Sequence, residues 1–234
     1  QSMAMLQQKY LTAKYGLAEV KLAPVQDNVA TASSKKDTTA ETRHEQPPLL
    51  PPADGPFGLE AGLTQKNIED MIGAKLKPLP DSVNLYTSDK LPKSNADFEM
   101  YGLLISPKAG LCQIRAVGKN IDTDSYGLAL KSRFEELSSS LSSLYGKAET
   151  TDLLLSGSIW KEPQDWMMGL NKKERFLSAT WKGTQETPLK NNIGAISIEA
   201  RANSSAQGYV YLQYTFTNDD VCQAEIDGAK KSSL

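Results

Sequence analysis

The side chains best able to do covalent chemistry in this chain are its two cysteines, Cys112 and Cys222. Alternation along a predicted strand places Cys112 on the inward face, together with Ile114 and Ala116. Cys222 and Ile226 are four residues apart, so they share one face of a predicted C-terminal helix. If that helix packs on the sheet, the two sulfurs can form a disulfide that closes a long loop. Two separate buried thiols are the alternative.

The histidine content limits the other kinds of catalysis. The single histidine, His44, lies in a polar segment that we interpret as a linker. The predicted folded region therefore lacks a Ser–His or Cys–His pair and any zinc site that needs two imidazoles. The sequence also contains no glycine-rich phosphate loop and no GxSxG elbow. We expect no catalytic residue, no metal site and no cofactor.

Three acidic residues, Asp122, Asp124 and Asp152, raise the question of calcium binding or carboxylate catalysis. The stretch IDTDS has two acids at alternate positions, but it lacks the glycine and the distal glutamate of an EF-hand loop. An Asp-Ser pair directly before a predicted helix is typical of a helix cap. We therefore interpret Asp124 as a cap rather than as a metal ligand.

The aromatic residues offer a candidate contact surface. Trp160, Trp166 and Trp181 lie close together in the sequence. Each tryptophan can bury about 150–250 Å², so at least two of them are predicted to serve the core. Trp166, flanked by an aspartate and two methionines, is the one that we predict at a surface. Tyr209 and Tyr211 point outward from the last predicted strand, and the three together form the candidate interaction surface.

The overall composition excludes several classes of function. A net charge of -2 creates no field that would attract nucleic acid. No apolar run approaches the ~18 residues of a membrane span, and no signal peptide is visible. Because the chain opens on Gln1 rather than Met, the lack of a visible signal or anchor carries little information about location.

We predict three regions along the chain. Residues 1–23 contain helix formers with apolar side chains at helical spacing, which predicts a short amphipathic helix or tail that can lie on a membrane or dock on a partner. Residues 24–56 are rich in Pro, Ser and Thr and include PPLLPP, which predicts a flexible linker. Residues 57–234 have the periodicity of a single α+β domain.

The folded region has the pattern of an antiparallel sheet with helices packed mainly on one face. In the last predicted strand, apolar side chains alternate with tyrosine and glutamine, which gives one apolar face and one mixed face. Predicted helices cover residues 65–72, 125–145 and 218–231, short helices are predicted around 153–155 and 164–170, and predicted strands cover 98–106, 111–118, 175–181, 192–201 and 209–216.

The stretch GLTQKNIEDMIG, residues 62–73, resembles the motif G-[ML]-[TS]-x-x-x-[VI]-x-x-x-[LI]-G of BamE (SmpA/OmlA)-type envelope proteins and of the β-lactamase inhibitor protein. The resemblance implies a helix with an adjoining turn beside an antiparallel sheet, in a module that binds other proteins. Thr64 can cap this helix, but Asn67 stands where a capping box has Glu or Gln, so we expect an incomplete box.

A longer pattern runs through the folded region: FGLEAGLT, GLC, LYG, GSIWKEPQDWM, KKERFLSATW and LQYTF. Over about residues 57–226 it is similar to a family of uncharacterised proteobacterial proteins that are often exported or tethered. The resemblance implies a bacterial envelope address, and it implies no activity and no binding residues.

These patterns together predict a non-catalytic protein-interaction module of the bacterial cell envelope. We expect a protein partner, no nucleic acid, and membrane contact only through the N-terminal tether; oligomeric state stays open. The expected location is periplasmic or envelope-tethered, with the cytoplasm as the alternative. A small apolar ligand held between sheet and helices is the alternative function. An enzyme that uses Glu135, Glu136 or Glu199 is less favoured, because no partner group is positioned for it.

Overall fold

A computed structural model of the chain describes residues 50–232. The helix or tail predicted for residues 1–23, and all of the linker predicted for 24–56 except its last seven residues, lie outside the described residues. Residues 50–56 fall in the same compact unit as the described residues that follow. The backbone N–H of Ala53 donates to the Gly58 carbonyl at 2.9 Å, and Asn191 Nδ2 donates to the Asp54 carbonyl at 3.3 Å.

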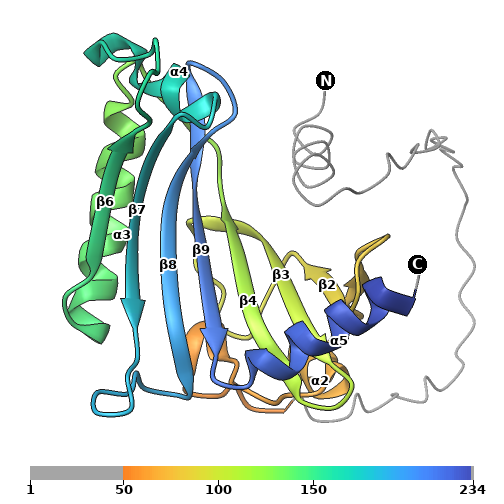
Figure 1. The fold of residues 1–234 in the computed structure, drawn as a ribbon. Coiled ribbons are helices and arrows are strands. Elements are labelled where there is room, and N and C mark those ends of the chain that lie inside the picture. The colour runs from red at the N-terminus through yellow and green to blue at the C-terminus, as the bar shows by residue number, and fades with distance from the viewer. Residues whose placement is uncertain (1–49, 233–234) are drawn as a thin grey trace, which may run out of the picture. The chain divides into compact units, whose positions relative to one another are not determined.

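The centre of the fold is one antiparallel sheet (Figure 1). Its strands lie in the order β1-β2-β3-β4-β9-β8-β7-β6, and the short β5 pairs with β9 where β4 has ended. Neighbouring strands are mostly hairpin partners, whereas β4 and β9 join the two halves of the sheet across a long sequence separation. The strands are β1 (Lys77–Pro78), β2 (Leu85–Ser88), β3 (Phe98–Ser106), β4 (Gly110–Gly118), β5 (Ile121–Asp122), β6 (Glu149–Leu154), β7 (Arg175–Lys182), β8 (Ile193–Ala202) and β9 (Gln207–Phe216).

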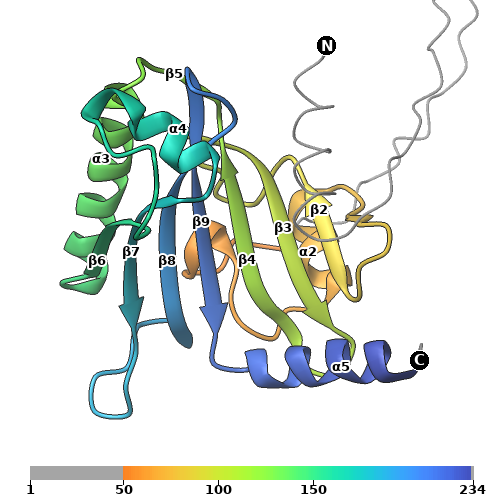
Figure 2. The same ribbon diagram turned by 45° about the horizontal axis from the view of Figure 1, so that its top comes forward.

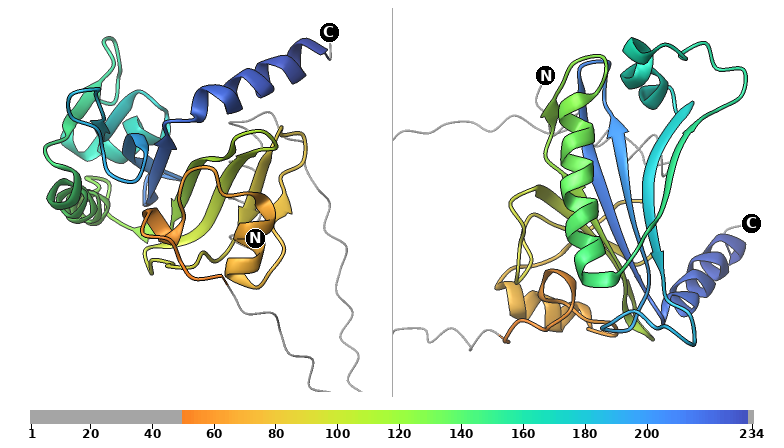
Figure 3. Two further views of the ribbon diagram at one scale, coloured as in Figure 1. Left: turned by 90° about the horizontal axis from the view of Figure 1, so that it is seen from below. Right: turned by 90° about the vertical axis from the view of Figure 1, so that its left-hand side faces the viewer.

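Helices cover the two faces of the sheet unequally. The described residues form α2 (Gln65–Ile72), α3 (Leu128–Tyr145), α4 (Trp166–Asn171) and α5 (Asp219–Ser232), with single turns η1 (Pro56–Gly58) and η2 (Pro163–Asp165). Helices α2 and α3 lie on one face, which we call the core face, and α5 crosses the other, which we call the α5 face (Figure 3). Helix α4 lies at the end of the strands remote from α2 and α5 (Figure 2). The predicted α+β fold is confirmed.

The core face contains most of the buried apolar side chains, because the long strands turn most of their apolar residues toward α2, α3 and α4. On β9 the predicted alternation is confirmed, since Val210, Leu212, Tyr214 and Phe216 all belong to this cluster. Trp181 of β7 also points to it, and its Nε1 donates to the Gly146 carbonyl at 2.8 Å, directly after α3. The sheet therefore separates a thick apolar layer from a more polar surface.

Two helix predictions differ from the structure. The long helix begins at Leu128 rather than at 125. The short helix predicted around 153–155 is wrong, because residues 149–154 form strand β6, paired with β7 from Glu149↔Thr180 to Leu154↔Arg175. Three consecutive leucines favour a helix locally, but the adjoining β-branched threonines and the hydrogen bonds to β7 decide for the strand.

Candidate functional site

The disulfide is present: Cys112 Sγ and Cys222 Sγ are bonded, with the two Cα atoms 6.4 Å apart. Both residues are buried and join β4 to α5 across 110 positions of the sequence. Polar contacts hold α5 at its start and in its middle. Gln113 Nε2 donates to Asp219 Oδ1 at 2.8 Å, and Asn84 Nδ2 donates to Glu225 Oε2 at 3.0 Å.

A β-bulge brings the disulfide to the α5 face. The pairing register shifts between Leu104 and Ile105 of β3, so that Cys112 is an extra residue of β4. It packs with Leu104 and Cys222 beneath α5, while Ile114 stays on the core face. The prediction that Cys112 shares a face with Ile114 is therefore wrong, because an inserted residue reverses the alternation of the strand.

Trp166 is buried on the core face, where only 3% of its surface is exposed. Lys131 Nζ lies 4.3 Å from the centre of the indole ring and Arg175 Cζ 5.9 Å from it, so two cations stack against the ring. Burial and, secondarily, the charge of Arg175 lower the pKa of Lys131. A Cβ at Gly127 would come within 2.3 Å of the indole, so only glycine fits there. Trp166 thus anchors α4 to the start of α3.

Tyr209 and Tyr211 point to the α5 face, but they are only 3% and 5% exposed. The guanidinium of Arg201 covers Tyr211, with Cζ 3.6 Å from the ring centre, and Arg201 Nη2 donates to Glu199 Oε2 at 2.6 Å. Trp166 lies on the opposite side of the sheet from both tyrosines. The predicted surface of Trp166, Tyr209 and Tyr211 is therefore wrong, because the sheet separates its members and each is covered by neighbouring side chains.

The three aspartates singled out from the sequence have structural partners. Asp122 accepts a hydrogen bond from Gln207 Nε2 at 2.8 Å, and Asp152 is paired with Arg175 Nη2 at 3.1 Å. The N-cap residue of the long helix is Gly127 rather than Asp124, but Asp124 Oδ1 accepts from the backbone N–H of Leu128 at 3.0 Å and so satisfies an amide of the first turn. Within residues 50–232, no group of three or more His, Cys, Asp or Glu side chains gathers as a metal site would require.

The carboxylates considered for catalysis do not come together. Glu135 and Glu136 lie on the exposed side of α3, which covers the core face, and Glu136 pairs with Arg133 at 2.8 Å. Glu199 is on β8, where Ile198 and Ala200 point to the core face, so Glu199 points to the α5 face. The sheet lies between Glu199 and the other two, so Glu199 cannot act on one substrate together with Glu135 or Glu136.

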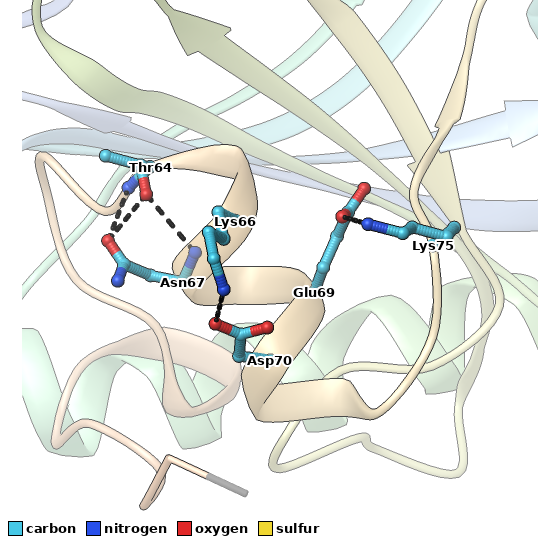
Figure 4. Close-up of polar contacts among 6 residues, drawn as sticks. All are labelled: Thr64, Lys66, Asn67, Glu69, Asp70 and Lys75. Atoms are coloured by element: carbon cyan, nitrogen blue, oxygen red, sulfur yellow. Dashed lines mark hydrogen bonds and ion pairs between the residues drawn. The ribbon is translucent and has the colours of Figure 1, made fainter. Parts of the chain in front are cut away.

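The GLTQKNIEDMIG motif forms α2 and the turn after it (Figure 4). Thr64 Oγ1 accepts from the backbone N–H of Asn67, and Asn67 Oδ1 accepts from the backbone N–H of Thr64, each at 3.2 Å. The expectation of an incomplete capping box is wrong, because the shorter amide side chain of Asn67 also reaches back to the cap. Gly73 ends the helix in the left-handed conformation, with φ 63°.

Glu69 of α2 lies in a groove of about 460 Å³ between α2, Tyr86 and Ser106. Only 8% of this residue is exposed, and its carboxylate accepts from Gln65 Nε2 (2.9 Å), Lys75 Nζ (2.6 Å) and the Leu76 backbone N–H (3.1 Å). The hydrogen bond from Lys75 is the main cause that lowers the pKa of Glu69. With its oxygens occupied in this way, Glu69 fastens the loop after α2 to the helix.

An open region lies at the far edge of the sheet, where β6 is the last strand. Five of the six side chains of β6 are exposed, and Leu154 is half-buried. Leu153 of β6 and Phe176 of β7 are direct neighbours in the sheet. Both point to the α5 face, because the next residue of β7, Leu177, packs on the core. We call Leu153, Leu155, Ile159 and Phe176 the edge patch; each is between 42% and 73% exposed.

The backbone of β6 is also open on one side. Leu155 N–H donates to the Glu174 carbonyl at 2.7 Å, in register with the β6–β7 pairing. Antiparallel alternation then directs the N–H and C=O groups of Thr150, Asp152 and Leu154 away from β7. Within the described part of the chain, no other strand lies beside them. Sequence reasoning missed this edge because residues 153–155 were predicted as helix; the pair of threonines before them was the available signal.

Between residues 50 and 232, no helix combines the length and the apolar character needed to cross a bilayer. No family model, curated protein or solved structure matches this chain. The geometry of its own residues therefore carries the functional proposal.

Proposed function

We propose that this chain is a non-catalytic protein-interaction module of the bacterial cell envelope, and that it binds through the edge patch and strand β6. The edge patch is the observation that carries the proposal. Four large apolar side chains are exposed on and beside a strand whose outward backbone groups have no neighbouring strand among the described residues. Exposed apolar groups beside an open strand edge are typical of protein-binding surfaces.

The chemistry of the remaining residues is consistent with a binding role. Most of the carboxylates considered above accept hydrogen bonds or form ion pairs, and Glu199 points to the opposite side of the sheet from Glu135 and Glu136. A group that is fully occupied in the folded state has little freedom to transfer protons to a substrate. The proposal therefore relies on surface contact rather than on a reacting group.

The disulfide supports an address in an oxidising compartment. Cys112 and Cys222 are bonded across 110 residues, and such long-range bridges persist mainly in secreted and periplasmic proteins. The resemblance of residues 57–226 to exported proteobacterial proteins agrees with this address. Thiol trapping in intact cells tests it. Cysteines that react only after reduction support the envelope, and two freely reactive thiols in unfolded protein would refute it.

In-cell crosslinking of the full chain followed by purification tests the binding surface. We compare the wild-type chain with Phe176→Lys, which places a charge in the edge patch, and with Leu144→Lys, which charges an exposed leucine of α3 outside the edge patch. The proposal predicts that Phe176→Lys removes the crosslinked species and that Leu144→Lys keeps them. Equal crosslinking of all three proteins would refute the role of the edge patch.

A further inference from the structure

We propose that the edge patch and β6 are completed by a second copy of this chain, joined as an antiparallel β6–β6 pair about a twofold axis at Leu153. This inference deepens the proposed function by naming the partner of the same surface. Within residues 50–232, the outward backbone groups of β6 have no strand beside them, and the apolar side chains next to them are exposed.

The open backbone requires an extended strand as its partner. The outward N–H and C=O groups belong to alternate residues, Thr150, Asp152 and Leu154, as the bond between Leu155 and Glu174 establishes. Such a row of groups is satisfied by another strand, whose own outward groups must recur with the same spacing of two. Two copies of β6 in antiparallel orientation meet this condition for each other.

The side chains select the register of the pair. With the twofold axis at Leu153, Asp152 lies opposite Leu154 of the second copy, so that outward groups face outward groups. The two Leu153 side chains then meet on the α5 face, each flanked by its own Phe176. This register therefore removes apolar groups of both copies from water.

Neighbouring registers are less favourable. An axis at Asp152 would place two carboxylates directly opposite each other, which is destabilising in a sheet. An axis at Thr151 would set Leu153 against Glu149 and leave the edge patches of the two copies apart. An axis placed after Leu153 would pair residues that lie beyond Leu154, where β6 ends. The axis at Leu153 is the one that joins strand pairing with apolar contact.

The opposite edge of the sheet does not offer such pairing. There β1 has only two residues, Lys77 and Pro78, and proline has no N–H to donate. A single pairing edge in the described body gives a closed pair of chains rather than an open chain of copies, because an isologous contact uses the same surface on both.

Cysteine crosslinking of the full chain tests the register. The two native cysteines are bonded to each other, so an introduced cysteine is the free thiol. In the proposed pair, residue 153 faces its own copy at a non-hydrogen-bonded position, with a Cα separation of about 4.5 Å, within reach of a disulfide. Leu153→Cys is therefore expected to give a covalent dimer under mild oxidation.

Thr151→Cys is the matched control, because it lies on the same strand and face. In the proposed register the two copies of residue 151 are four positions apart along the strands, roughly 13 Å, so they do not bridge. The dimer fraction of Leu153→Cys is expected to be about ten times that of Thr151→Cys. Such a ratio corresponds to a free-energy preference for the proposed register. Equal yields from both variants, or a larger yield from Thr151→Cys, would overturn the register.

Light scattering of the wild-type chain supplies the second measurement. The proposal expects twice the chain mass at high concentration, reduced to the single chain mass by Leu153→Lys but not by Leu144→Lys. A single chain mass at every concentration overturns the second copy as partner. If Phe176→Lys still removes the in-cell crosslinks in that case, the proposed function stands with a different protein as partner; if it does not, both proposals fail.

Discussion

At one edge of the sheet, β1 is a two-residue strand that ends in Pro78; at the other, β6 runs for six residues without a proline. The half of the sheet next to β1 is covered on both faces, by α2 and by α5, and is crosslinked by the disulfide (Figure 1). In the half next to β6, Leu153 of β6 and Phe176 of β7 are exposed on the α5 face. The comparison indicates that the first half is crosslinked and covered by helices on both faces, whereas the second keeps apolar surface available for binding.

This difference has a physical origin in the two sides of β7. Trp181 points to the core face and is buried, while Phe176, five residues earlier on the same strand, points to the α5 face and is exposed. A monomer gains nothing from leaving a phenylalanine in water. Its retention at the open edge is what a contact surface requires. Four variants test the contrast, from the largest expected effect on stability to the smallest.

Trp166→Ala is expected to be the most destabilising change, by about 3–5 kcal/mol of unfolding free energy. The indole fills the space between α4 and the start of α3, beneath Lys131 and Arg175, and its removal leaves a cavity. Urea unfolding monitored by circular dichroism measures the loss. Leu144→Ala, at an exposed position of α3, is the control. If Trp166→Ala lowers the unfolding free energy no more than Leu144→Ala does, Trp166 is not part of the core.

Loss of the disulfide is expected to cost about 2–4 kcal/mol, because the bridge shortens the unfolded chain across 110 residues. Cys112→Ser combined with Cys222→Ser should lower the urea midpoint, and reductant should lower that of the wild type by a similar amount. Hydrogen exchange should show the largest loss of protection in α5 and β4. Protection lost equally at β6 would contradict the division into two halves.

Removing the charge of Glu69 is expected to have a smaller effect, about 1 kcal/mol, because its partner Lys75 is largely exposed to water. The folded protein lowers the pKa of Glu69 below its ordinary value of 4.5. The carboxylate therefore stabilises the fold above about pH 4.5, and this contribution disappears as the pH falls through the lowered pKa. Unfolding measured from pH 6 downward should show a weaker pH dependence for Glu69→Gln than for the wild type, and identical profiles would contradict this role.

Phe176→Ser is expected to change stability by less than about 0.5 kcal/mol under conditions where the chain is a single copy, since the side chain is exposed. The same change should weaken self-association in light scattering. Trp181→Ala on the same strand provides the contrast, because its loss should destabilise the fold strongly. A large destabilisation by Phe176→Ser in dilute solution would mean that the edge patch serves the body itself.

The sequence by itself determined most elements of the fold. Period-two alternation on β9 and helical spacing on α3 identify the apolar face of each element, because local backbone geometry fixes which side chains share a face. The even count and the predicted packing of the last helix allowed a bond between Cys112 and Cys222, but two separate buried thiols stayed open as the alternative. The motif at residues 62–73 predicted α2 together with its glycine stop.

Only the tertiary structure decided which surface remained open. The bulge at Cys112 is a property of pairing with β3, so no pattern within β4 alone could place the sulfur on the α5 face. Trp166 is covered by Lys131 of α3 and Arg175 of β7, which are distant from it or from each other in the sequence. Residues 149–154 form a strand because their backbone pairs with β7. Exposure is a sum over neighbours distant in sequence, and one segment does not contain that information.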